Sequence, residues 1–200
     1  STKILASNDL DEHIIGSLHE QGAVIDQWGV GTKLVTAFDQ PALGGVYKLG
    51  AIKGKGSKWQ LKIKLSDQTA KVSNPGALQI RRFEYRGEYL ADMIYNEISE
   101  NPPSRAIIDV ADITIRRELP RVATYHDLLI PIFRSGTLVY ERPAIHEIRA
   151  SVGKEFDRFY AGVKRLLNPH VYSVGLEEGL HRQKVQLVQV AREQATKIDD

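Results

Sequence analysis

The residues best suited to chemistry lie near the amino end of the chain, in the run Trp28-Gly29-Val30-Gly31-Thr32. This run follows the apolar segment 24–27, which is predicted to be a short strand. Glycines after a strand let the backbone turn its N–H groups inward, and Thr32 adds a hydroxyl. Such a turn suits a phosphate, because several donors converge on one anion.

A second polar turn, Ser7-Asn8-Asp9, lies between a predicted strand over 3–6 and a predicted helix over 10–21. Two strand–turn–helix units with polar turns at the same end predict one phosphate held from two sides. Each turn also has a simpler explanation. Glycines after a strand often only permit a tight turn, and Asp9 and Glu12 have the spacing of a capping box at the start of a helix. Both interpretations stay open at this point.

The composition limits the class of protein. Of the 200 residues, 42% are hydrophobic and 26% are charged, which is ordinary for a globular protein with a full core. The absence of cysteine excludes a disulfide framework, a thiol nucleophile and a cysteine-ligated zinc site. A net charge of +2 gives no strong attraction to nucleic acid, and no apolar run is long enough to span a bilayer. We therefore expect a cytoplasmic protein without nucleic-acid or membrane partners.

Most other groups of polar residues favour structural explanations. The six histidines include no pair at three- or four-residue spacing, so no metal site is predicted. Lysines on the outer face of a strand prevent edge pairing, and we interpret the seven lysines between residues 48 and 71 in this way. Arg81-Arg82 and Arg116-Arg117 are within reach of a phosphate in principle, but a solvated face is the commoner role. His170 is assigned to packing at the end of a helix.

The hydrophobic pattern changes along the chain. The first 36 residues alternate strand and helix patterns, as in an α/β protein. Strict alternation over 59–65 predicts a strand with Trp59 facing a core, paired with 46–52 through the turn 54–57. Residues 100–105 contain two prolines and predict a loop. Further strands are predicted at 78–85, 89–95, 127–134 and 137–141, with the last two joined at Ser135-Gly136.

Two helices are predicted near the carboxyl end. The first is a long buried helix that ends at Asn168-Pro169, because apolar residues recur at spacings of three and four. They are Ile145, Ile148, Val152, Phe156, Phe159, Val163 and Leu166. The second helix starts near Glu177 and is expected to bury Leu180.

Several motifs, taken in order, resemble nicotinate phosphoribosyltransferases. They lie at residues 7–12, 28–36, 40–49, 64–66, 71–76, 128–133 and 168–176. Their order and spacing cover nearly the whole chain, and they resemble only the C-terminal part of that enzyme.

The resemblance implies an α/β fold: the C-terminal portion of a barrel-like α/β phosphoribosyltransferase domain, followed by antiparallel β strands and two C-terminal helices. Residues 1–44 would be the end of the barrel with its phosphate-binding turns. Residues 45–142 would be a β-rich region shared in part with a second domain, and residues 143–200 would be the C-terminal helices.

The resemblance also implies an activity. Members of this family form nicotinate mononucleotide from nicotinate and phosphoribosyl pyrophosphate with ATP hydrolysis, a step of NAD salvage. ATP and Mg would be co-substrates of the full enzyme, and this segment alone is expected to bind no cofactor. The catalytic histidine is expected upstream of Ser1, so no catalytic residue is assigned and the isolated chain is expected to be inactive.

The same resemblance assigns to this segment the cradle for the 5′-phosphate. The residues expected to bind the phosphate and the ribose are Ser7, Asn8, Asp9, Gly29, Gly31 and Thr32. The expected partners are the two substrates and the missing N-terminal part of the same enzyme, and a homodimer is left open. The alternatives are another phosphosugar-binding α/β barrel enzyme and a non-catalytic binding or interaction module.

Overall fold

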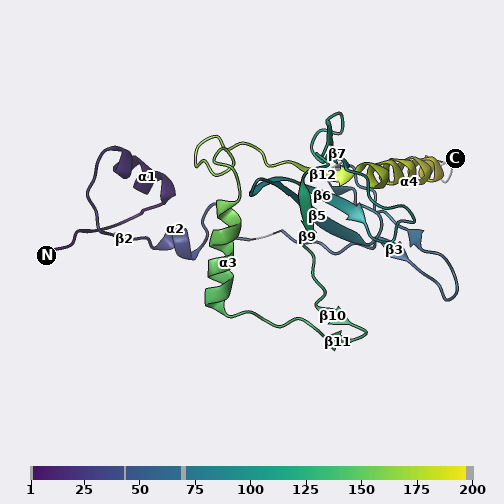
Figure 1. Ribbon diagram of the computed structural model, residues 1–200, viewed down its shortest axis with the longest axis horizontal. Helices are drawn as coiled ribbons and strands as arrows, with labels where there is room; N and C mark the ends of the chain where they lie inside the picture. The colour runs from purple at the N-terminus through teal and green to yellow at the C-terminus, as the bar shows by residue number, and fades with distance from the viewer. Residues whose placement is uncertain (1, 43, 69–70, 197–200) are drawn as a thin grey trace. The chain divides into compact units, whose positions relative to one another are not determined.

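The computed structural model describes residues 2–42, 44–68 and 71–196 as a mixed α/β fold, in which four helices accompany a mixed sheet (Figure 1). The chain forms two compact units. We call them the first unit, Ser1–Tyr47 with Arg165–Pro169, and the second unit, Lys48–Lys164 with His170–Asp200. Each unit is described by itself below.

The first unit contains one parallel strand pair and two helices. They are β1 (Leu5–Ser7), α1 (Glu12–Glu20), β2 (Gln27–Gly29) and α2 (Thr32–Val35). The start of α1 differs from the predicted capping box, because the side chain of Asp11 accepts the hydrogen bond from the N–H of Ile14 at 2.8 Å. Asp9 lies outside this cap. The barrel to which β1 and β2 are assigned by resemblance stays a prediction.

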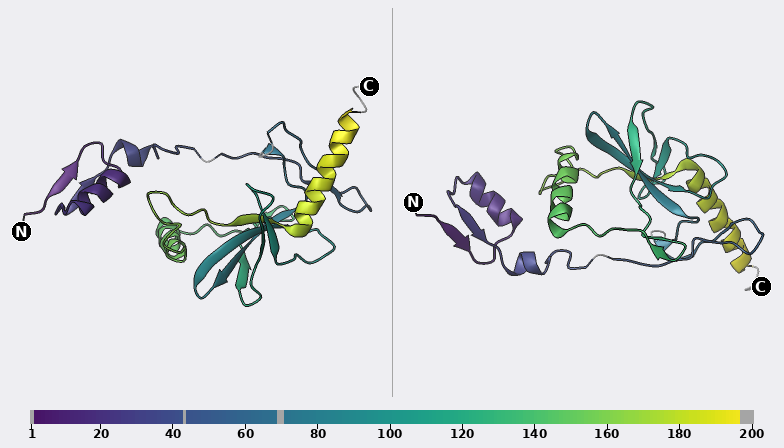
Figure 2. Two further views of the ribbon diagram at one scale, coloured as in Figure 1. Left: turned by 90° about the horizontal axis from the view of Figure 1, so that it is seen from above. Right: turned by 60° about the horizontal axis from the view of Figure 1, so that its bottom comes forward.

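The second unit is built on a mixed sheet (Figure 2). The sheet has six strands in the order β8-β7-β12-β6-β5-β9. Only the pairing of β12 with β6 is parallel in the described part of this sheet; the other neighbours are antiparallel. The strands are β5 (Leu78–Tyr85), β6 (Glu88–Asn96), β7 (Ala106–Asp109), β8 (Arg116–Glu118), β9 (Thr124–Asp127) and β12 (Val174–Glu177). The predicted strands at 78–85 and 89–95 are confirmed, whereas β7, β8 and β12 were not predicted.

The hydrophobic core of the second unit lies on one face of β5 and β6. Alternate residues of these strands point the same way, which brings Phe83 and Met93, each 1% exposed, into one cluster. The other members are Ala91, Tyr95, Ile107, Leu119 and Ala123. The hairpin between the two strands turns at Arg86 and Gly87, both with positive φ, as in the tight turns that match strand twist.

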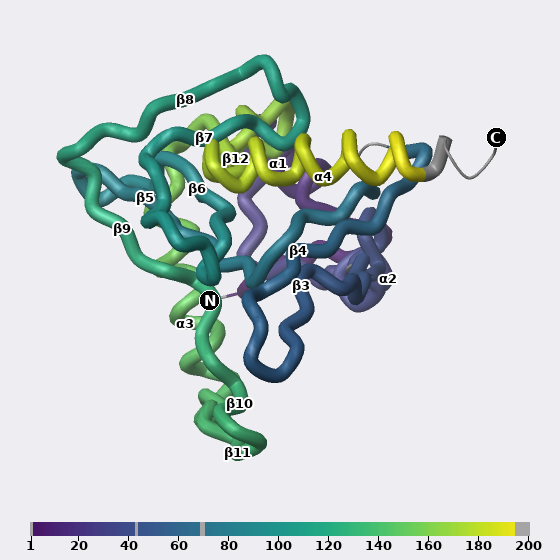
Figure 3. Tube along the Cα trace, turned by 90° about the vertical axis from the view of Figure 1, so that its right-hand side faces the viewer, coloured from purple at the N-terminus to yellow at the C-terminus, as the bar shows by residue number. Residues whose placement is uncertain are grey.

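The last helix of the fold, α4 (Glu178–Thr196), begins directly after β12 (Figure 3). The carboxylate of Glu177 accepts hydrogen bonds from the N–H of Leu180 at 2.9 Å and from the hydroxyl of Ser104 at 2.6 Å. Burial by itself raises the pKa of Glu177, but the hydrogen bonds outweigh it and the pKa is lowered overall. The predicted helix from about Glu177, with Leu180 buried, is confirmed.

Two short hairpins complete the second unit. They are β3 (Ala51–Ile52) with β4 (Gln60–Leu61), and β10 (Phe133–Arg134) with β11 (Thr137–Leu138). Both hairpins were predicted, but their strands are shorter than expected, and the predicted strand over 127–134 is divided between β9 and β10. Trp59, which was expected in a core, is 47% exposed.

The predicted buried helix is shorter and exposed. Helix α3 (Ile145–Asp157) ends well before Asn168-Pro169 (Figure 1). Its last turn contacts the six-stranded sheet, where Glu155 accepts a hydrogen bond from the hydroxyl of Tyr89 at 2.6 Å. Val152 and Phe156 of its apolar stripe are 62% and 55% exposed. The expected burial is therefore wrong for the described chain. The apolar stripe correctly indicates an amphipathic helix. Periodicity alone, however, does not show which surface, if any, covers the apolar face of that helix.

Phe83 and Phe156 make a matched pair for a stability test. We expect Phe83→Ala to reduce the free energy of unfolding by about 3 to 5 kcal/mol, because it removes a buried ring from the core. Phe156→Ala removes an exposed ring and should change it by about 0.5 kcal/mol or less. Chemical denaturation followed by circular dichroism measures both. Equal losses in the two variants would contradict the described core.

The stability of the second unit should also depend on the ionisation of Glu177. A carboxylate whose pKa is lowered on folding stabilises the fold above its unfolded pKa of about 4.3, and this stabilisation is lost as the pH falls through the folded value. We therefore expect the melting temperature of Glu177→Gln to lie furthest below that of the unchanged chain above about pH 5, with the gap closing under acid. Thermal melts at a series of pH values test this. A gap that stays constant would show that ionisation of Glu177 has no role.

Candidate phosphate-binding site

The two predicted turns lie side by side in the first unit. Strands β1 and β2 pair in parallel, with Ser7 opposite Gly29 at their carboxyl ends. The turn 8–9 therefore begins beside the turn 30–31. Sequence reasoning placed the two turns at the same end, and the register of the strands is what brings them together.

The two turns pack most tightly against each other at Gly29. The hydroxyl of Ser7 donates to the carbonyl oxygen of Gly29 over 3.3 Å. A Cβ atom at Gly29 would lie 3.1 Å from Oγ and 3.2 Å from Cβ of Ser7, which is tighter than ordinary contact. Gly31 has φ −101° and no atom within 4 Å of an added Cβ. Gly31 therefore has no positive φ, and the tight packing lies at Gly29.

Asn8 and Asp9 have left-handed backbone conformations. Their φ angles are 102° and 45°, and such values are uncommon and costly for residues other than glycine. The side chain of Asp9 is exposed, and within the described residues it makes no hydrogen bond or ion pair. Since Asp11 caps α1, capping does not explain Asp9. Strained backbone with unused polar groups is typical of functional turns.

Backbone N–H groups of the turn after β2 are also available to a ligand. In the described chain, no hydrogen bond uses the N–H of Gly31 as donor. Thr32 is the first residue of α2, so its N–H has no acceptor within the helix. Its side chain is exposed to solvent. These groups can donate to an anion placed over the turn.

Lys33 adds a positive charge that the sequence analysis did not assign. Its Nζ lies 3.8 Å from Oδ2 of Asp11 and 3.9 Å from the centre of the Phe38 ring. The ion pair connects the start of α1 to α2. The pKa of Asp11 is lowered, chiefly by the hydrogen bond from the N–H of Ile14 and further by Lys33. The signal in the sequence that could have identified this residue is its position directly after Gly-x-Gly-Thr.

Other candidate residues have partners elsewhere. Arg82 forms a two-point ion pair with Asp92, and Arg81 does so with Asp127, so neither belongs to a solvated face as expected. His170 contacts the hydroxyl of Tyr160 and does not end a helix. Among the described residues there is no metal-binding cluster of three or more His, Cys, Asp or Glu side chains. No described helix has the length and apolar character needed to cross a membrane.

Comparison with known proteins places this architecture in a family. The model of the nicotinate phosphoribosyltransferase C-terminal domain matches residues 78–184. The chain belongs to the nicotinate phosphoribosyltransferase family. The matched range lies in the second unit and in five residues of the first, 165–169, and contains all six strands of the mixed sheet.

Family members of known name also match the first unit. Nicotinate phosphoribosyltransferase of Bacillus subtilis is 38% identical over 192 residues, which are 93% of this chain and 38% of that protein. The human protein of the same name is 32% identical over 184 residues, 90% of this chain and 33% of that protein. The crystal structure of human nicotinic acid phosphoribosyltransferase has a TM-score of 0.66 at 25% identity, over 94% of this chain and 33% of that one. The chain thus spans about a third of the length of the relatives it matches.

The glycines of the turn provide a direct test of the geometry. We expect Gly29→Ala to speed amide hydrogen exchange in β1 and β2, because the new methyl group is forced against Ser7. Gly31→Ala has open space around the new methyl group and should leave exchange in these strands nearly unchanged. Exchange followed by mass spectrometry of peptides covering 3–9 and 25–31 measures the difference. A larger effect at Gly31 would contradict the packing described here.

Proposed function

We propose that this chain is the C-terminal part of a nicotinate phosphoribosyltransferase, and that its first unit binds the 5′-phosphate of phosphoribosyl pyrophosphate. The complete enzyme would form nicotinate mononucleotide and pyrophosphate with ATP hydrolysis, in NAD salvage. Family membership supports the reaction. The side-by-side placement of the turns after β1 and β2 supports the role of this segment.

The main support for a phosphate site is a set of donors fixed by the backbone. The N–H groups of Gly31 and Thr32 are unused by the described chain, and the register of β1 with β2 sets them beside the Ser7–Asp9 turn. Donors held by a parallel strand pair need little reorganisation when an anion binds. Lys33 adds a charge that strengthens hydrogen bonding to a phosphate.

Asp9 has a different role from the donors. A carboxylate repels a phosphate at close range, so Asp9 is unsuited to contact the phosphate itself. Its oxygens accept hydrogen bonds, and hydroxyl groups of a ribose are suitable donors. We assign Asp9 to the ribose next to the phosphate. Ser7 holds Gly29 through its hydroxyl and shapes the turn.

The remaining chemistry is assigned to the full enzyme. ATP with its Mg would be a co-substrate there, and no step described here runs through a metal. Nicotinate, phosphoribosyl pyrophosphate and the N-terminal part of the same enzyme are the proposed partners. The division into a barrel end at 1–44, a shared β-rich region at 45–142 and C-terminal helices at 143–200 belongs to the same proposal. A cytoplasmic location and a homodimer stay predictions.

A chimaera tests the proposal. This chain replaces the matching 192-residue part of the Bacillus subtilis relative, and formation of nicotinate mononucleotide is measured with and without ATP. We expect the chimaera to be active and the 200-residue chain alone to be inactive. A folded chimaera without activity, or equal activity in the chain alone, would refute the assignment. Binding of another ligand by the chain alone, with no gain from the N-terminal part, would favour a binding module.

Within the active chimaera, Thr32→Val tests the proposed contact with the phosphate, and Asp9→Asn tests the proposed contact with the ribose. Thr32→Val removes a hydroxyl donor to the phosphate, and Asp9→Asn replaces the charged acceptor for the ribose hydroxyls by a neutral one. Each change costs about 1.5 kcal/mol. We expect KM for phosphoribosyl pyrophosphate to rise about tenfold, with KM for nicotinate unchanged. Thr137→Val, at an exposed position of β11, is the control. An unchanged KM for phosphoribosyl pyrophosphate in both variants would exclude the phosphate cradle while leaving the enzyme assignment intact.

A further inference from the structure

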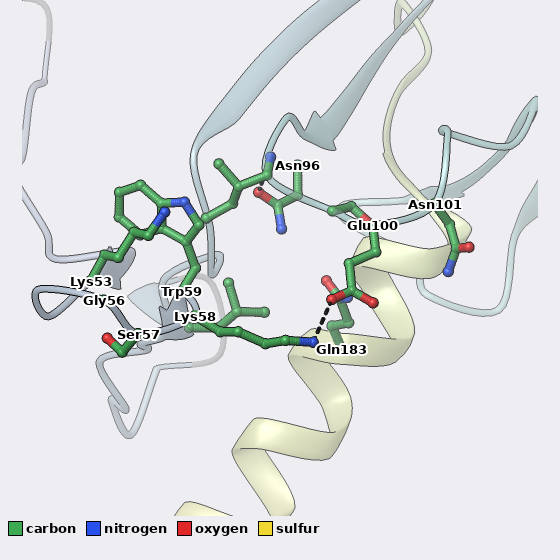
Figure 4. Close-up of a pocket in the computed structure, with 12 residues that line it drawn as sticks. Lys53, Gly56, Ser57, Lys58, Trp59, Asn96, Glu100, Asn101 and Gln183 are labelled. Atoms are coloured by element: carbon green, nitrogen blue, oxygen red, sulfur yellow. Dashed lines mark hydrogen bonds and ion pairs between the residues drawn. The ribbon is translucent and has the colours of Figure 1, made fainter.

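A polar pocket of about 520 Å³ lies within the second unit, between the β3–β4 hairpin, the end of β6 and helix α4 (Figure 4). Its volume is in the range of small-molecule sites. The polar and aromatic residues around it are Lys53, Ser57, Lys58, Trp59, Asn96, Glu100, Asn101 and Gln183. Neither the family motifs nor the proposed phosphate turns use these residues.

The buried end of the pocket is formed by Asn96. This residue is 6% exposed, and its Oδ1 accepts hydrogen bonds from the N–H groups of Ala77 at 3.0 Å and Ile98 at 3.3 Å. Two backbone donors can face only the carbonyl oxygen of an amide, so they fix the orientation of the side chain. Its Nδ2 then points into the pocket (Figure 4) and donates to nothing in the described chain. This nitrogen is open to the pocket, so a ligand atom can accept its hydrogen bond.

The rim of the pocket presents an aromatic face. Trp59 was expected in a core by its position in the alternating strand, yet it is 47% exposed. The Nζ of Lys53 lies 5.6 Å from the centre of its ring, which places a cation beside the indole. An exposed indole beside a positive charge favours a planar ring that carries an anionic group. Stacking of a nucleobase on such a ring contributes about 1 to 3 kcal/mol.

The side chain of Lys58 extends across the pocket and is held there only by an exposed ion pair. Lys58 and Glu100 form an ion pair of 3.1 Å with side chains 91% and 82% exposed (Figure 4). An exposed pair of this kind stabilises a protein by about 1 kcal/mol at most, so Lys58 is free to exchange Glu100 for a ligand anion. The pocket thus combines two cations, one aromatic face and one amide donor from a largely buried side chain.

From these features we infer that the pocket binds a mononucleotide. The base stacks on Trp59, the phosphate takes Lys53 and Lys58 as counter-ions, and the amide of Asn96 donates to an acceptor of the nucleotide. Helix α4 and the loop 99–101 bound the side opposite Trp59, so the space suits one nucleotide better than a polymer. The inference rests on the second unit alone and does not depend on the proposed enzyme activity.

Calorimetric titration of the 200-residue chain with AMP tests the inference, with adenosine and inorganic phosphate as the two separated halves of the ligand. We expect AMP to bind about tenfold more tightly than either half, since one site engages both. Binding of phosphate as tight as that of AMP would show that the lysines act alone. Tighter binding of a ten-nucleotide single strand would indicate a nucleic-acid surface. Either result, or no binding of AMP, overturns the inference.

Variants locate the ligand within the pocket. Asn96→Asp keeps the oxygen that accepts from Ala77 and Ile98 but replaces the donor by an anionic oxygen, so AMP should bind about tenfold more weakly. Trp59→Ala, at an exposed position, should weaken binding about fivefold or more. Glu100→Gln removes the competitor of the phosphate and should tighten binding about twofold.

The control is Lys55→Gln, which removes a lysine from the same hairpin turn outside the pocket and should leave the affinity nearly unchanged. Circular dichroism verifies that each variant is folded. If Asn96→Asp fails to fold, Trp59→Ala together with Lys55→Gln still decides the result. Equal affinities in the unchanged chain, in Asn96→Asp and in Trp59→Ala would overturn the inference.

Discussion

The insertion of β12 between β6 and β7 is the constraint on which the second unit depends. Residues 174–177 arrive from near the carboxyl end of the chain and pair in parallel with 92–94 and antiparallel with 107–109. Without β12, these two strands of the sheet would have unpaired backbone groups. Strands β12 and β7 lie so close together at Gly175 that an added Cβ would lie 2.7 Å from Cβ of Ile107 and 2.8 Å from the carbonyl oxygen of Ile108. Glycine is therefore needed in the middle of the sheet.

Polar and aromatic contacts lie at both ends of β12. Tyr172, just before the strand, donates from its hydroxyl to Asp92 at 3.0 Å, and Asp92 also pairs with Arg82 at 2.7 Å. Burial, together with the neighbouring charge of Asp92, raises the pKa of Tyr172, while the hydrogen-bonded carboxylate of Asp92 raises that of Arg82. Phe159 packs edge-on against Tyr172. On the other side of the strand, Glu177 starts α4. The segment around β12 thus adds a hydrogen bond to the ion pair between β5 and β6, an aromatic contact and the start of the last helix.

The candidate sites of the two units are formed by different kinds of structure. In the first unit, a parallel strand pair sets two turns side by side, and the donors are backbone N–H groups beside a strained segment at Asn8 and Asp9. In the second unit, a pocket forms where a hairpin, a strand end and a helix meet, and the donor is the side chain of Asn96. The family model covers mainly the second unit, whereas the Bacillus subtilis and human relatives match across both. This chain, which spans about a third of the length of those relatives, therefore contains both the paired turns of the first unit and the pocket of the second.

The sequence by itself determined the elements whose signals are local. Alternation predicted the strands at 78–85 and 89–95, turn residues predicted both short hairpins, and polar residues after apolar segments predicted the two turns. It could not determine features that depend on distant contacts. The tertiary structure decided the pairing of β12, the tight packing at Gly29, the exposure of Phe156 and the free amide of Asn96. Periodicity shows that a residue has an apolar face or a polar group, but only the folded chain supplies the neighbour that covers or satisfies it.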